Sequence, residues 1–217
     1  MNQEITKRIL SSIFVITIAL FFIIKGSFFF IFFMLIFFLV IAYEWYQMSR
    51  KSNYLLTGFI FLSFSTYSAY LLRGTTITEE FYFLMVILTC VATDIGGYIF
   101  GKIFKGPKLI KISPNKTYAG MFGGFFLSII SVNFFFNYAY ELNLEYKLGD
   151  FTQKVFILVL LISSVSQIGD LVVSYFKRKF KIKNTGKIIP GHGGLLDRID
   201  GMIFAFPATY LIFKIFY

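Results

Sequence analysis

Charged residues are scarce in this 217-residue chain, at 15% of the sequence, whereas soluble domains carry roughly 25%. Apolar residues make up 57%, and Phe alone occupies 31 positions. A soluble domain of this length could not hide so much apolar surface from water, and a disordered chain would not contain it. The composition therefore excludes both classes and indicates that lipid surrounds much of the protein.

Cysteine and histidine are nearly absent, with one residue of each, Cys90 and His192. A single cysteine excludes an intrachain disulfide. The two residues are too few for a zinc site built from Cys and His ligands, and no Ser-His-Asp or Cys-His arrangement is recognisable. No internal repeat or low-complexity linker divides the chain, so we expect one integral membrane domain over residues 1–217.

Long apolar runs are abundant, and seven of them can cross about 30 Å of hydrocarbon at about 1.5 Å per helical residue. The sequence therefore predicts an all-α, polytopic transmembrane helical bundle with about seven spans. The predicted spans are Ile9–Ile24, Ser27–Tyr46, Tyr54–Leu72, Phe81–Phe104, Ala119–Tyr140, Val155–Phe176 and Ile199–Phe216. No small-residue cleavage site follows the first span, so we expect it to be retained rather than removed as a signal peptide.

Positive charge is in excess, with 21 Lys and Arg against 11 Asp and Glu and a net charge of +10. With the N-terminus in the cytoplasm, 16 of the 21 basic residues fall on the inner side, as the positive-inside rule requires. Eleven of these lie in two segments, Lys102–Lys116 and Lys177–Lys187. Attraction to anionic lipid, at about 1 kcal/mol per residue, explains a loop with two basic residues but not these two segments.

Three carboxylates lie inside predicted spans, those of Glu44, Asp94 and Asp170. Each costs about 2.5–3.5 kcal/mol at a helix centre, so each needs a partner or a function. Glu44 lies near the inner end of its span, and we expect its carboxylate to reach the membrane interface. Asp94 and Asp170 lie at similar depths, about 10–12 Å inside the inner surface, and small residues flank both.

Asp197 and Asp200 open the last span, and their i, i+3 spacing predicts that they share one helix face. Carboxylates from three helices can therefore converge beneath two basic segments. Internal ion pairs, for example of Asp197 or Asp200 with Arg178, are the simpler alternative. We favour a site for a metal ion and a polyanion, because ion pairing alone does not require four acids and glycine-rich loops.

Carboxylate oxygens suit Mg²⁺, which usually bridges protein acids to phosphate oxygens. Lysines and glycine-rich backbone supply positive charge and N–H groups for those phosphates. The combination indicates phosphoryl or nucleotidyl transfer at a membrane surface, where positioning and electrostatics provide most of the catalysis.

The segment from Ser174 to Asp200 contains Ser-x-x-Lys-Arg and then Pro-x-His-Gly-Gly-x-x-Asp-Arg-x-Asp. It closely resembles the signature of the phosphatidate cytidylyltransferases, also called CDP-diacylglycerol synthases. Similar segments begin at Asp94, Ser113 and Gln167, so the resemblance covers a catalytic part over residues 94–217. The chain looks short for this family at its N-terminal end.

One position departs from the family pattern, because Asn184 stands where the pattern has Asp. An amide cannot replace a carboxylate as a base or as a strong Mg²⁺ ligand. Since four other acids remain, we expect that the family's Asp at this position is not essential to the chemistry.

The resemblance implies transfer of a cytidylyl group from CTP to phosphatidate, with Mg²⁺ required, giving CDP-diacylglycerol and pyrophosphate early in phospholipid biosynthesis. The expected metal ligands are Asp94, Asp170, Asp197 and Asp200. The expected catalytic residues are Asp170, Lys177, Arg178, His192, Asp197, Arg198 and Asp200. The expected substrate-binding residues are Ser113, Lys116, Thr117, Ser174, Gly193 and Gly194.

The expected partners are CTP, phosphatidate and membrane lipid, with no nucleic acid, while a homodimer stays open. We expect the cytoplasmic membrane of a bacterium, with the active site facing the cytoplasm. The alternatives are a CTP-dependent lipid kinase, another lipid nucleotidyltransferase, or a cation transporter that uses Asp94 and Asp170. The eleven clustered basic residues disfavour a transporter, because they would repel incoming cations.

Overall fold

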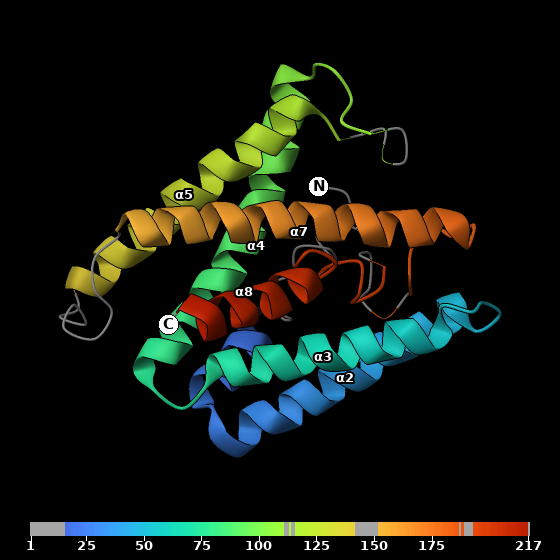
Figure 1. Ribbon diagram of the computed structural model, residues 1–217, viewed down its shortest axis with the longest axis horizontal. Coiled ribbons are helices and arrows are strands. Elements are labelled where there is room, and N and C mark those ends of the chain that lie inside the picture. Colours follow the sequence, from blue (N-terminus) through green and yellow to red (C-terminus); the bar gives the residue numbers. More distant parts are fainter. Residues whose placement is uncertain are drawn as a thin grey trace, which may run out of the picture.

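The computed structural model describes residues 16–110, 113, 116–141, 152–186, 188 and 193–216. Its named elements are all helices, so the predicted all-α fold class is confirmed for this part of the chain (Figure 1). They are α2 (Ser27–Ser49), α3 (Leu55–Arg73), α4 (Ile77–Phe104), α5 (Tyr118–Glu141), α7 (Gln153–Lys179) and α8 (Met202–Phe216), with a further helix over Ile16–Lys25.

Five of these helices, α2, α3, α4, α5 and α7, are long and apolar enough to cross a membrane. Two shorter apolar helices, Ile16–Lys25 and Met202–Ile215, correspond to the first and last predicted spans. Many large apolar side chains are exposed, and Phe28 and Phe134 reach 74%, which indicates surfaces that face lipid. The protein is therefore a multi-pass membrane protein, as predicted.

Several predicted span boundaries differ from the structure by one to four residues, and two of these differences have local reasons. Helix α4 begins at Ile77 rather than at Phe81, because Thr76 and Glu79 form a capping box. The last helix begins at Met202 rather than at Ile199, because the residues before it form turns. The start of the first predicted span lies outside the described residues.

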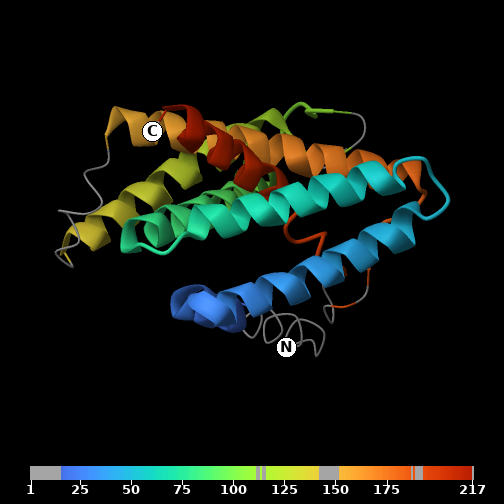
Figure 2. The same ribbon diagram turned by 60° about the horizontal axis from the view of Figure 1, so that its bottom comes forward.

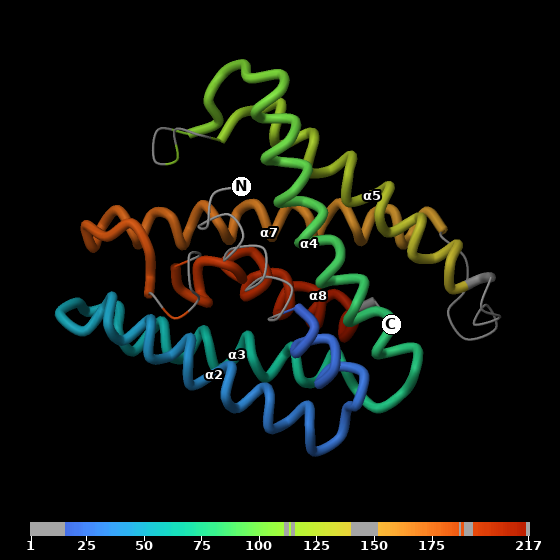
Figure 3. Tube along the Cα trace, turned by 180° about the vertical axis from the view of Figure 1, so that it is seen from behind, coloured from blue at the N-terminus to red at the C-terminus, as the bar shows by residue number. Residues whose placement is uncertain are grey.

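The helices form a layered arrangement in which α8 lies between α3 and α7 (Figure 1). Helices α2 and α3 run antiparallel, with α3 between α2 and α8 (Figure 2). Helix α4 crosses α7 and packs along α5, as seen from behind in Figure 3. This arrangement brings the C-terminal part of α7 and the start of α8 close to the end of α2.

A buried apolar cluster joins α2, α3 and α7 to the start of α8 and the residues that precede it. It consists of Ile41, Trp45, Met48, Leu62, Val173, Leu196, Ile199 and Ile203. Leu196 is 1% exposed and Ile199 is 8% exposed, so these two side chains hold the turn before α8 against the bundle. Asp197 and Arg198, which lie between them in the sequence, are thereby held at the edge of the cluster.

Glycines allow α4 and α5 to approach closely. A Cβ atom at Gly96 would lie 2.3 Å from the carbonyl oxygen of Gly123, and one at Gly120 would lie 2.7 Å from that of Gly97. Only a residue without a side chain fits at such backbone contacts. The close packing brings the middle of α4, which carries Asp94, near the start of α5.

We predict that Gly96→Ala destabilises the protein, whereas its neighbour Gly97→Ala does not. A methyl group at Gly96 would overlap the backbone of α5 and should cost about 1–3 kcal/mol. A methyl group at Gly97 would meet its nearest atom at 3.7 Å, an ordinary contact. Thermal unfolding in detergent measures both, and equal midpoints for the two variants would contradict the helix packing described here.

Candidate active site

The chain turns at the C-terminal end of α7, where Lys181 has a positive φ of 57°. The N–H of Ile182 donates to the carbonyl of Lys177 at 2.9 Å. We call residues 182–186 and 193–201 the signature loop, because they carry most of the family-like residues after α7. Residues 187 and 189–192 lie outside the described part, and so the predicted role of His192 stays a prediction.

The carboxylate of Glu44 in α2 contacts the signature loop at three points. Its Oε1 accepts the N–H of Leu195 at 2.8 Å, while Oε2 accepts the N–H of Leu196 at 2.8 Å and the hydroxyl of Thr185 at 3.0 Å. Glu44 is only 1% exposed. The prediction that it reaches the membrane interface was therefore wrong, since the loop supplies hydrogen-bond donors inside the protein.

Asp197 connects the same loop to α7. Its Oδ2 accepts the N–H groups of Thr185 and Gly194, at 2.8 and 3.1 Å. Its Oδ1 pairs with the ammonium of Lys177 at 3.0 Å. Both carboxylate oxygens thus have partners within the chain, so Asp197 fixes the loop as well as balancing the charge of Lys177.

Asp200 approaches the same lysine, with Oδ2 at 3.8 Å from the Lys177 ammonium. Its Oδ1 accepts the N–H of Gly201 at 3.1 Å. Asp197 and Asp200 therefore lie on one side, as predicted, but in turns rather than on the first turn of a helix. The described ion pairs of both acids involve Lys177 instead of Arg178, which is exposed.

Asp170 brings a further lysine into the site. Its carboxylate forms an ion pair with Lys116, which comes just before α5, and accepts the hydroxyl of Ser174 at 3.4 Å. Gly169 permits the signature loop to approach, since a Cβ atom there would lie 2.9 Å from the carbonyl oxygen of Asp200. The carboxylates of Asp170 and Asp200 are consequently close enough for their charges to interact.

Asp94 of α4 lies at the same site. The charges of Asp170, Lys116 and Arg198 act on its carboxylate, and Asp94 in turn acts on Asp200. The structure therefore brings together carboxylates from α4, α7 and the signature loop, with lysines between them. The sequence predicted that carboxylates from three helices would converge, whereas here the third group comes from turns that precede α8.

The expected phosphate-binding residues Ser113, Lys116 and Thr117 lie just before α5 and have local backbone and side-chain contacts. Lys108 and Thr117 form an isolated antiparallel bridge, and the N–H of Lys116 donates to the carbonyl of Ser113 at 3.0 Å. The hydroxyl oxygen of Thr117 accepts the N–H of Gly120 at 3.1 Å and so caps α5.

The two signature glycines are explained by the loop itself. Gly193 has a φ of +91°, which favours glycine. A Cβ atom at Gly194 would lie 2.2 Å from the Thr185 hydroxyl and 2.6 Å from Glu44 Oε2. Because the Gly194 N–H already donates to Asp197, binding of CTP by that group would require it to leave this partner. Asn184 is exposed beside Gly193.

Within the described ranges, no group of three or more acidic, His or Cys side chains is arranged to hold a metal ion. Lys116 and Lys177 pair with the acids instead. Mg²⁺, however, commonly takes one or two carboxylates and completes its shell with phosphate oxygens and water. Asp170 and Asp200 supply that kind of donor set, so the chemistry of the site fits a phosphate-bound Mg²⁺.

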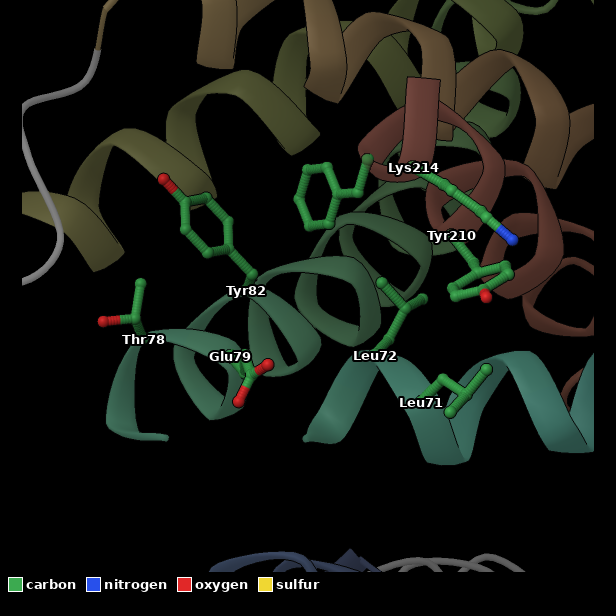
Figure 4. Close-up of a pocket in the computed structure, with 8 residues that line it drawn as sticks. Leu71, Leu72, Thr78, Glu79, Tyr82, Tyr210 and Lys214 are labelled. Carbon is green, nitrogen blue, oxygen red and sulfur yellow. The ribbon is translucent and has the colours of Figure 1, made fainter. Parts of the chain in front are cut away.

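A separate cavity of about 410 Å³ lies away from this site, at the other end of the helix bundle (Figure 4). It is lined by Leu71, Leu72, Thr78, Glu79, Tyr82, Tyr210, Phe213 and Lys214. These residues come from the end of α3, the start of α4 and the end of α8. None of them is a predicted site residue, so the acid and lysine cluster remains the candidate active site.

Comparison with known proteins identifies the family of the chain. The chain matches the Cytidylyltransferase family over residues 52–216. It is 35% identical to a phosphatidate cytidylyltransferase of Rickettsia prowazekii over 220 residues, which cover 97% of this chain and 92% of the relative. The matched region thus begins well before Asp94, and this relative is of similar length.

Other relatives are longer. A phosphatidate cytidylyltransferase of Brucella suis is 39% identical over 163 residues, covering 73% of this chain and 56% of the relative. One of Staphylococcus aureus is 42% identical over 135 residues, covering 60% and 48% respectively. The chain therefore belongs to the phosphatidate cytidylyltransferase family.

Proposed function

We propose that the protein transfers the cytidylyl group of CTP to phosphatidate and releases pyrophosphate. The observation that carries the proposal is the pairing of Lys116 and Lys177 with Asp170, Asp197 and Asp200 at one site. Lysine ammonium groups held in this way are placed to receive phosphates. Family membership gives the phosphates their identity, those of CTP and phosphatidate.

The reaction needs little proton transfer. A phosphate monoester has a second pKa near 6, so phosphatidate arrives mostly ionised. One of its oxygens forms a bond to the α-phosphorus of CTP, and the bond from that phosphorus to the bridging oxygen of the pyrophosphate breaks. The chain therefore requires no general base, and its residues act by positioning the two substrates and balancing their charge.

Lys116 and Lys177 would neutralise the phosphates in this reaction. Each is half-buried beside a carboxylate, where water screens charge less than it does at an open surface. Arg198, whose charge acts on Asp94, would add a third cation on the side of α4. Together these residues favour the negative charge that accumulates as pyrophosphate leaves.

Asp170 and Asp200 would hold Mg²⁺, with Asp94 beside them as a further ligand or as an orienting group. When bound, the ion would supply positive charge shared by the carboxylates and the phosphate oxygens. Asp197 accepts two N–H groups of the signature loop and pairs with Lys177, so its contribution would be to orient that lysine and the loop.

We also propose on which side of the membrane the active site lies. Basic residues cluster in the segments on either side of the site, and the positive-inside rule places such segments in the cytoplasm. The N-terminus and the active site would then face the cytoplasm, in the inner membrane of a bacterium. CTP would reach the site from water, and phosphatidate from the bilayer.

The product assay is the direct test. Purified protein in detergent, with CTP labelled at the α-phosphorus, phosphatidate and Mg²⁺, should form labelled CDP-diacylglycerol and an equal amount of pyrophosphate. Formation of CDP and a phosphorylated lipid would identify a lipid kinase instead. No lipid product above background would contradict both enzyme assignments.

We predict that Asp170→Asn and Asp200→Asn each lower kcat by about 100-fold or more, because each removes a negatively charged oxygen donor that would hold Mg²⁺. Each variant should also raise the Mg²⁺ concentration needed for half-maximal activity. Lys214→Met, in the cavity of Figure 4, is the control and should keep wild-type rates. Wild-type turnover and Mg²⁺ dependence in both Asn variants would refute the assignment of metal ligands.

A further inference from the structure

Glu44 is a buried carboxylate beside the site, and no cation is among its described partners. Its described partners are two backbone N–H groups and a hydroxyl, all from the signature loop. A buried carboxylate is costly unless donors surround it, so this geometry is a strong constraint on where the loop can lie. Glu44 also precedes residue 52, where the family match begins.

The contacts of Glu44 close the base of the loop. Thr185 belongs to the first described part of the loop, and Leu195 and Leu196 belong to the second, so the same carboxylate holds both parts. Gly186 and Gly194 both lie against this carboxylate, where Cβ atoms would come to 2.6 Å from its oxygens. The loop therefore fits closely around Glu44, and a larger residue at either glycine position would collide with its carboxylate.

This anchor is linked directly to the residues of the site. Thr185 donates its hydroxyl to Glu44 and its N–H to Asp197. Asp197 in turn pairs with Lys177, the lysine that Asp200 also approaches. A chain of hydrogen bonds and ion pairs thus runs from the end of α2 to the cationic residue that would receive a phosphate.

We propose that Glu44 is a positioning residue for the cytidylyl transfer, acting through Thr185 and Asp197 to set the place of Lys177 and the signature loop. The role rests on the proposed function, although the anchoring itself does not. Glu44 need not touch substrate. Its contribution is that the loop is already ordered when CTP and phosphatidate arrive, so that binding energy is not spent on ordering it.

The main variant is Glu44→Gln, which keeps the size of the side chain. An amide offers one acceptor oxygen, and its NH₂ group would face a loop N–H group donor to donor. We expect kcat to fall about 10- to 100-fold, with deuterium exchange in peptides covering residues 193–199 at least about tenfold faster. Peptides from α4 and α5 should exchange as in the wild type.

A second pair of variants changes a single hydroxyl contact and tests the proposal if Glu44→Gln does not fold. Thr185→Val removes only the hydroxyl donor and should lower kcat, whereas Thr185→Ser keeps the donor and should restore it. Combining Glu44→Gln with Thr185→Val, if both fold, should cost less than the product of the single effects, because both remove the same contact. Wild-type kcat in Thr185→Val would overturn the proposal.

Glu80→Gln is the matched control, because Glu80 is also a carboxylate that joins two helices, through an ion pair with Arg73 at 3.0 Å. It lies away from the site and should keep the wild-type kcat. Faster loop exchange with unchanged kcat in Glu44→Gln would overturn the positioning role. An inactive wild-type protein would instead refute the proposed function, and the exchange measurement would still test the anchor.

Discussion

A carboxylate that leaves water must find opposite charge or hydrogen-bond donors, and lipid supplies neither. In this chain the partners come from other helices. Lys116 and Lys177 compensate Asp170 and Asp197, and loop N–H groups compensate Glu44. Because these contacts connect α2, α7, the signature loop and the start of α5, the balancing of charge also fixes the geometry of the site.

The same constraint explains how the site can be formed before substrate binds. Lysines held by carboxylates are already desolvated and in place, so a phosphate meets groups that need little reorganisation. The glycines of α4 and α5 and the glycines of the loop contribute by letting backbones approach, which brings Asp94 and the loop close to Asp170. Close packing and charge pairing thus depend on each other.

Much of the fold follows from local properties of the sequence. An apolar run of sufficient length predicts a span wherever it occurs, which is why five long helices lie where spans were predicted. The boundaries depend on short-range details, such as the capping box at Thr76. At the last span, Leu196 and Ile199 enter the core, while Asp197 and Asp200 face Lys177. The two acids lie on one side as predicted, but turns rather than a helix place them there.

By itself the sequence determined the membrane class, the approximate spans and the acids and lysines that would share a site, because hydrophobic length and residue depth are readable along one chain. Only the tertiary structure decided the partners. Lys177 rather than Arg178 meets the two acids, and Glu44 turns inward, because its donors lie in a loop that is distant in sequence. A carboxylate's environment is set by which helices pack beside it, and packing is a property of the whole bundle.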